Sequence, residues 1–321
     1  MREKVLGSFF ILMVLLASCA PTDETTLKTN EPVIILSTFR GGGSLIQQIL
    51  ARNIDYAVNT NSNQVANPPG FNKWRAYMAW SHDGGWLAFD KPTQNGNNVI
   101  FITNWPDQSK LIQVTSDSSN NLYPSWSPGS DAIIYENYYG KIYGVEIRCL
   151  LLDQVCNPKP FFIAYGSLPV WSSDGKYIAY QGSRDHINDA GKIFLMRLLD
   201  GENTRRIISP EGENCYHPGW SPDGSRLTIE CKKGIYVVKS DGTDMNLMVY
   251  GDMAKWSPDG KLIAFRGGES LDPNLGKTVG LSGFDAELSS NALFTIRPDG
   301  TEMKRITSEN YQVVEQFFWE P

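Results

Sequence analysis

The chain has 321 residues, of which 41% are hydrophobic and 12% are aromatic, enough to form a sizeable core. Its formal net charge is −6 at neutral pH, with acidic and basic residues mixed along the sequence. This mildly acidic balance argues against nucleic acid as a partner and against a polybasic membrane-binding surface.

The first residues have the pattern of an export signal. Arg2 and Lys4 precede an apolar run over 5–16 that is too short to span a bilayer. The run ends in Leu16-Ala17-Ser18-Cys19, which resembles the lipobox of bacterial lipoproteins. That resemblance implies a signal peptide over 1–18 and a lipid-bearing Cys19 that anchors the protein to a membrane. An ordinary signal peptide with an incidental cysteine is the alternative.

The segment 19–32 is polar and has almost nothing to bury, which predicts a flexible tether. No later apolar run is long enough to cross a membrane. The remaining residues, 33–321, are long for an ordinary domain but suit a single all-β repeat domain.

A tryptophan-led phrase recurs through this domain. Its clearest copy is Trp220-Ser221-Pro222-Asp223-Gly224, and the copies stand 36 to 63 residues apart. They begin at Trp80, Trp126, Trp171, Trp220 and Trp256, with a truncated copy at Trp319. A recurring unit of this length indicates a repeat architecture. Because the phrase stands in every repeat, we expect its residues to be structural.

The fourth repeat shows the expected unit. Short segments at 217–221, 226–231, 235–238 and 246–249 have strand composition and are separated by tight turns rich in Asp and Gly. They predict a four-stranded antiparallel meander, the blade of a β-propeller. The other copies align with it, and no helix is expected in the repeats.

The Trp-Ser-Pro-Asp-Gly phrase, an Ile-Ala-Phe-like strand and an Asp-Gly-Thr turn together resemble the repeat of TolB-type, WD-repeat-like propellers. The resemblance covers roughly 74–321 and implies a β-propeller. TolB-type proteins dock on envelope proteins, so it also implies an envelope partner. The same repeat occurs in propellers of prolyl-oligopeptidase relatives and of polysaccharide-lyase-like enzymes, so it does not specify a function.

The truncated sixth copy predicts how the ring closes. Its segment 313–319 supplies one innermost strand, and an isolated edge strand is unfavourable. We expect its partners at 33–37, 45–49 and about 55–59, near the start of the domain. The sequence thus predicts a six-bladed β-propeller of four-stranded antiparallel blades, in which N-terminal strands pair with the C-terminal strand.

Four cysteines remain besides Cys19, an even number that suits an oxidising compartment. Cys215 and Cys231 stand symmetrically about Asp223 in a predicted hairpin, and Cys149 and Cys156 flank a short excursion. We expect the disulfides Cys149–Cys156 and Cys215–Cys231, with free buried thiols as the alternative.

Long connections are predicted to gather on one face of the propeller, at 39–44, 90–98, 182–191 and 267–291. Because loops on rigid scaffolds often carry function, they are candidates for recognition. The candidate residues in them are Arg184, Asp185, His186, Asp272 and Lys277. A solvated loop and a tolerated insertion are the alternatives.

The channel mouth is expected three residues before each tryptophan. These positions hold Tyr77, Tyr123, Leu168, His217, Met253 and Gln316, and none is acidic. They could stack on a peptide or a sugar, or simply plug the axis.

Catalysis has little support in the sequence. The three histidines, His82, His186 and His217, fall in different repeats and roles, so we expect neither a metal site nor a cofactor. The leading hypothesis is a monomeric, lipid-anchored, non-enzymatic propeller of the bacterial envelope that binds a protein or peptide. Binding or processing of a cell-surface polysaccharide at the channel mouth is the second hypothesis. An unrecognised enzymatic site is the third.

Overall fold

The computed structural model describes the backbone over 33–40, 43–50, 77–105, 109–116, 118–152, 156–183, 188–267, 292–307 and 314–319. In 33–40, 43–50 and 314–318 only the backbone is described. By spatial proximity the chain divides into Met1–Asn30 and Glu31–Pro321, and all described residues lie in the second unit. The predicted third closing strand at 55–59 lies outside the described residues.

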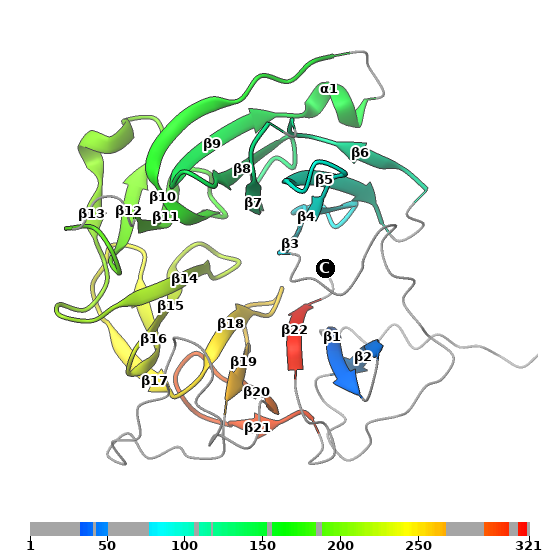
Figure 1. Ribbon diagram of the computed structural model, residues 1–321. Helices are drawn as coiled ribbons and strands as arrows, with labels where there is room; N and C mark the ends of the chain where they lie inside the picture. The colour runs from blue at the N-terminus through cyan, green and yellow to red at the C-terminus, as the bar shows by residue number, and fades with distance from the viewer. Residues whose placement is uncertain are drawn as a thin grey trace, which may run out of the picture. The chain divides into compact units, whose positions relative to one another are not determined.

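All paired strands of the described chain run antiparallel, and most pair with their neighbours in sequence (Figure 1). One four-stranded sheet is β3 (Met78–Trp80), β4 (Trp86–Pro92), β5 (Asn98–Asn104) and β6 (Leu111–Gln113). A second is β14 (Cys215–Trp220), β15 (Arg226–Cys231), β16 (Gly234–Lys239) and β17 (Asn246–Val249). A third is β18 (Asp252–Trp256), β19 (Ile263–Gly267), β20 (Ala292–Ile296) and β21 (Lys304–Arg305).

The second and third repeats share one long strand. Their seven-stranded sheet is β7 (Asn121–Trp126), β8 (Ala132–Asn137), β9 (Lys141–Glu146), β10 (Phe161–Trp171), β11 (Tyr177–Gly182), β12 (Ile193–Arg197) and β13 (Arg206–Ile207). The first half of β10 pairs with β9 and the second half with β11. The fourth strand of one repeat therefore runs without a break into the first strand of the next (Figure 1).

A three-stranded sheet joins the two ends of the domain. Its strands are β1 (Val33–Arg40), β2 (Gly43–Leu50) and β22 (Val314–Trp319). β1 pairs with β2 on one side and with β22 on the other, with Ile34 opposite Trp319. This is the pairing that the truncated sixth repeat predicted.

Two single turns of helix correct the expectation that the repeats contain none. The helix α1 (Arg148–Leu151) follows β9, and the 3₁₀ helix η1 (Gly201–Thr204) follows β12. Both are four residues long and bury no side chain, so they shape connections and do not add to the core. Among the described residues, no helix is long and apolar enough to cross a membrane.

The core lies between successive sheets. One buried cluster joins Ala179, Ile193 and Leu195 of the third repeat to Leu227 and Ile229 of the fourth. Comparable clusters join the first repeat to the second, the second to the third, and the fourth to the fifth. The sheets of the second to fifth repeats therefore bury both faces, and their central strands are apolar on both sides.

The repeated turn is a hydrogen-bonded unit. In the fourth repeat, Ser221 Oγ donates to Asp223 Oδ1 at 2.6 Å, and Asp223 Oδ1 also accepts from the Ser225 amide at 3.0 Å. Gly224 takes the positive φ of 69° that the turn requires. The hydrogen bond from Ser221, followed by that from Ser225, holds the pKa of Asp223 below its usual value. This supports the expectation that the repeated aspartates form turns.

Four of the repeat tryptophans link their innermost strand to the preceding one. The indole Nε1 of Trp126, for example, donates to the Ala79 carbonyl at 2.9 Å. The same bond, to the carbonyl one residue before the previous tryptophan, recurs from Trp220 to Val170, from Trp256 to Gly219 and from Trp319 to Lys255. Trp171 differs, because its indole donates to Gly175 within its own turn. The phrase recurs in sequence because it forms the junction between repeats.

We expect Trp126→Phe to lower the free energy of unfolding by about 2–3 kcal/mol, since Trp126 is only 2% exposed and its loss leaves the Ala79 carbonyl without this donor. The matched control is Trp171→Phe, which breaks a bond within one turn and none between repeats. Urea unfolding of both variants measures the difference. Equal losses in the two variants would contradict the linking role.

Candidate binding site at the innermost strands

Each described innermost strand from β7 to β18 is interrupted at the predicted mouth position. The strand register shifts between Leu122 and Ser125 in β7, and at the equivalent places in β10, β14 and β18. A non-glycine residue with positive φ stands at each shift: Tyr123 (56°), Leu168 (51°), His217 (46°) and Met253 (58°). Such backbone is uncommon outside glycine and persists only when its surroundings hold it. β-Bulges therefore form the mouth positions.

Acids on second strands hold two of these bulges, through the amides of Leu168 and Ala254. The residue ten positions after each repeat tryptophan is polar: Asp90, Glu136, Gln181, Glu230 and Arg266. Asp90 accepts from the Tyr77 amide at 2.7 Å, and Glu136 accepts from the Leu168 amide at 3.1 Å. The sequence reasoning found no acid in the ring of mouth positions and missed these carboxylates. The sequence did contain a signal for them, because a polar residue stands ten positions after every one of these tryptophans.

Glu230 connects two repeats. Its Oε1 accepts from the Ala254 amide of the next repeat at 2.8 Å, and its Oε2 lies 3.0 Å from Nδ1 of His217. Glu230 is 1% exposed, whereas the His217 side chain is 44% exposed. Burial lowers the pKa of His217, but the neighbouring Glu230 carboxylate outweighs that effect and the pKa is raised. The pair presents a half-exposed, proton-binding ring to solvent.

Asp90 is a buried acid, and within the described part of the chain it forms no ion pair. Asp90 is 3% exposed, and burial raises the pKa of its carboxyl group to about 7. The hydrogen bond from the Tyr77 amide opposes this shift. In the fifth repeat the roles are exchanged, because Arg266 Nε donates to Asp252 Oδ1 at 2.7 Å. The first and second strands of the repeats thus contain a buried acid in the first repeat and an ion pair in the fifth.

Two aromatic rings stand beside these acids. The ring centroids of Tyr77 and Tyr123 are 3.9 Å apart at an interplanar angle of 45°. Burial, then the contact with Tyr77, raises the pKa of the Tyr123 hydroxyl, and the charges of Glu136 and Asp90 add to the effect. We call Tyr77, Asp90, Tyr123, Glu136, His217 and Glu230 the inner-strand cluster. Its aromatic rings, including the half-exposed ring of His217, are the surfaces that a partner could contact, while its carboxylates hold the backbone amides.

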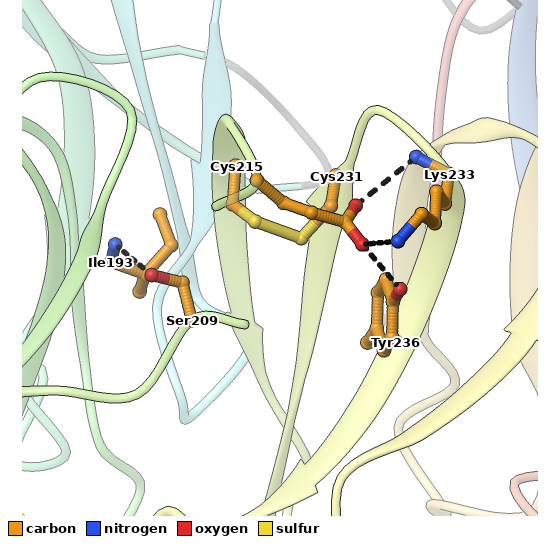
Figure 2. Close-up of a disulfide and its surroundings, with 7 residues drawn as sticks. Ile193, Ser209, Cys215, Cys231, Lys233 and Tyr236 are labelled. Carbon is orange, nitrogen blue, oxygen red and sulfur yellow. Dashed lines mark hydrogen bonds and ion pairs between the residues drawn. A yellow bond between two sulfur atoms is a disulfide. The ribbon is translucent and has the colours of Figure 1, made fainter. Parts of the chain in front are cut away.

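Both predicted disulfides are present. Cys149 and Cys156 are joined around the loop after α1, and Cys215 and Cys231 are joined across β14 and β15, where they lie opposite each other with Cα atoms 4.0 Å apart. Figure 2 shows the second disulfide with Lys233 and Tyr236 beside it. Both of these residues bond Glu213, at 2.8 Å from Lys233 Nζ and 2.9 Å from the Tyr236 hydroxyl. The disulfide therefore braces the hairpin that carries His217 and Glu230. Paired disulfides are typical of exported proteins.

The structure brings together only some of the predicted site residues. Tyr77 and Tyr123 are in contact, and His217 stands at the equivalent position of another repeat. Gln316 lies in β22, where only the backbone is described. The remaining predicted residues lie outside the described part of the chain: Cys19, Arg184, Asp185, His186, Asp272 and Lys277. Within the described part, no three His, Cys, Asp or Glu side chains are grouped so as to hold a metal ion.

The sheets, the inner-strand bulges and the order of the repeats define the chain as an all-β protein with a β-propeller fold. Similarity to solved structures agrees. TolB from Acinetobacter baumannii superposes with a TM-score of 0.63 at 13% identity, over 90% of this chain and 67% of that one. At this identity the likeness establishes the fold alone, a TolB-like β-propeller.

Two further structures superpose less closely. A putative TolB from Agrobacterium tumefaciens gives a TM-score of 0.44 at 20% identity, over 62% of this chain and 66% of that one. An oligogalacturonate lyase from Vibrio parahaemolyticus gives 0.43 at 15% identity, over 71% and 76%. No protein-family model matches the sequence. No curated protein matches it either.

Proposed function

We propose that this protein is a lipid-anchored protein of the bacterial envelope whose propeller binds a protein or peptide without catalysing a reaction. The inner-strand cluster is the observation that carries the proposal, because it brings the rings of Tyr77 and Tyr123 into contact beside the Asp90 and Glu136 carboxylates. The resemblance to TolB-type propellers, which dock on envelope proteins, supports it. The lipid on Cys19 would hold the domain at the membrane, with 19–32 as the tether.

The proposal includes a ring of six blades. β22, β1 and β2 would be three strands of the sixth blade, and the segment near 55–59 would be the fourth.

Removal of 313–321 should therefore abolish cooperative thermal unfolding, because the sixth blade would lose β22 and, with Trp319, its bond to the Lys255 carbonyl of the fifth repeat. Calorimetry of the truncated and full chains tests this. A melting transition that survives truncation unchanged would show that the ring does not depend on β22.

The binding proposal is tested with the full chain in detergent, incubated with detergent-solubilised envelope. We expect the wild type to retain a specific protein and Tyr77→Ala to reduce its recovery at least tenfold, because the ring that packs on Tyr123 is lost. A second variant shortens 267–291 to a turn and asks whether that loop contributes. Melting temperatures of both variants control for unfolding.

The second candidate is a cell-surface polysaccharide, favoured by the tyrosine pair, because aromatic rings can stack on sugars. A glycan array probed with wild type and Tyr77→Ala separates the two candidates. Array binding that depends on Tyr77, with no protein retained from the envelope, would replace the protein partner by a glycan. Retention of the same proteins by wild type and Tyr77→Ala would refute the cluster as the site.

A further inference from the structure

Exposed hydrophobic side chains are concentrated in the second repeat. Six of the ten large hydrophobic side chains that are exposed in the described part of the chain lie between positions 138 and 165. They are Tyr138, Tyr139, Leu152, Phe161, Phe162 and Tyr165, of which Tyr138 is 68% and Tyr139 is 65% exposed. Single exposed hydrophobic residues are ordinary, but a concentration of them marks an interaction surface.

These side chains continue a row of aromatic rings that starts in the core. Buried Tyr135 stacks on Tyr143 with centroids 6.1 Å apart, Tyr143 meets Phe162 at 5.9 Å, and Phe162 meets Tyr165 at 5.1 Å. The row crosses β8, β9 and β10. Each ring is supported by the one behind it, so the exposed rings are held in place before any partner arrives.

The equivalent rows in other repeats stop one strand earlier. Phe89 pairs with Phe101, Tyr180 with Phe194 and Phe265 with Phe294, at centroid distances of 6.2, 5.7 and 5.6 Å. The residues opposite these rings on the fourth strands are not aromatic: Gln113, Ile207 and Arg305. Extension of the row to the outermost strand distinguishes the second repeat, and the shared fold does not require it.

Positive charge surrounds the exposed rings. Lys141 Nζ lies 5.9 Å from the centre of the Tyr165 ring. A hollow of about 630 Å³ beside the Cys149–Cys156 disulfide is lined by Arg148, Lys159, Leu152, Phe161 and Glu146, among others. The acids beside the rings are Glu146 and Glu202, whose carboxylate accepts from the Tyr165 amide at 3.2 Å. Three described cations thus accompany two described acids here, although the whole chain has a net charge of −6. The charge complements an acidic partner.

The backbone beside the rings favours an extended partner. Within β10 the stretch from Phe161 to Tyr165 pairs with no described strand except β9, and the register with β11 begins only at Gly166. The Tyr165 amide, at the end of this stretch, donates to Glu202 Oε1. An extended peptide alongside such a strand can place alternate side chains on the sheet surface. The hollow next to Phe161 offers room for a side chain, which a flat lipid surface would not use.

We propose that this surface, made by Tyr138, Tyr139, Phe161, Phe162 and Tyr165 with Lys141, Arg148 and Lys159, binds an extended peptide rich in acidic and apolar residues. The apolar side chains of the peptide pack on Phe162 and Tyr165. Its carboxylates meet Lys141, Arg148 and Lys159, and one side chain enters the hollow. The surface lies on the outer strand of its repeat and is separate from the inner-strand cluster, so either site can be refuted while the other stands.

The test uses the full chain in detergent and an array of synthetic dodecapeptides in which Glu, Gln or Lys alternates with Phe, Tyr, Leu or Pro. We expect Glu-containing peptides to be retained at least tenfold better than their Lys counterparts. Phe162→Ser and Lys141→Glu should each reduce that retention at least tenfold. Ile207→Ser, at the equivalent fourth-strand position and 51% exposed, should leave it unchanged.

A second pair of variants removes the risk that a strand substitution unfolds the protein. Tyr138→Ser alters an exposed turn residue and should weaken binding, whereas Leu199→Ser alters a turn residue that is 95% exposed in the next repeat and should not. Equal retention of Glu and Lys peptides, or no retention, would overturn the proposal. So would binding of phosphatidylglycerol vesicles or glycans in place of peptides.

Discussion

At pH 8 the variant Asp90→Asn is expected to be more stable than the wild type by about 4 kcal/mol, and at pH 5 by only about 1.5 kcal/mol. The carboxyl of Asp90 has a pKa of about 7 in the folded protein, raised by burial, against an ordinary value near 4 in the unfolded chain. Asparagine keeps an oxygen that accepts from the Tyr77 amide but carries no charge to bury.

The direction of this pH dependence follows from the protons that the folded and unfolded states bind. Between about pH 4 and pH 7 the folded protein holds a proton on Asp90 that the unfolded chain has released, so stability falls as the pH rises. The contribution is complete below the unfolded pKa and is lost above the folded pKa. Urea unfolding at several pH values measures it.

Asp223→Asn is the matched control with the opposite sign. Hydrogen bonds from Ser221 and Ser225 lower the pKa of Asp223, so its carboxylate stabilises the fold at neutral pH and loses that effect in acid. Asp223→Asn should therefore be less stable than the wild type at pH 8. If Asp90→Asn shows the same pH profile as the wild type, the Asp90 carboxyl is not buried in its acid form.

The contrast between Asp90 and Asp223 shows what the sequence could predict. Asp223 stands in a phrase that recurs in every repeat, and recurrence correctly indicated a turn. Asp90 stands at a position that varies, with Glu136, Gln181, Glu230 and Arg266 as its equivalents. Varied residues give no repeat signal, and their role depends on a backbone amide that only the fold brings close.

The sequence predicted which residues stand at the mouth positions, but it did not predict their backbone conformation. Counting back three residues from each tryptophan located Tyr123, Leu168, His217 and Met253, and the structure gives all four a positive φ. Their residue types do not predict this conformation, because none of the four is glycine or asparagine. It is imposed by the neighbouring strand and by acids that accept the freed amides, such as Glu136 from Leu168.

The continuous strand between the second and third repeats could not be predicted from local sequence signals either. Strand composition and turn residues marked the ends of most strands, but they did not predict that β10 continues from one repeat into the next. The disulfides were predictable because Cys215 and Cys231 flank a turn whose geometry is fixed by Asp223 and Gly224. Local signals therefore located hairpins, while contacts between repeats required the structure.

Glu230→Ala is expected to lower the free energy of unfolding by about 3–5 kcal/mol, because it breaks a buried, charged hydrogen-bond network. Its carboxylate is the acceptor for the Ala254 amide of the next repeat and the partner of His217. Glu230→Gln retains an acceptor and should cost less, whereas Glu146→Ala, on an exposed strand end, should change stability by no more than about 0.5 kcal/mol.

A double-mutant cycle with His217→Ala separates the two contacts of Glu230. If the link to Ala254 dominates, Glu230→Ala remains costly in the His217→Ala background, and the repeats are joined through this carboxylate much as they are joined through the tryptophan indoles. If the cost disappears in that background, Glu230 serves mainly to hold the His217 ring. The main role of the Glu230 carboxylate would then be to orient the half-exposed His217 ring of the inner-strand cluster.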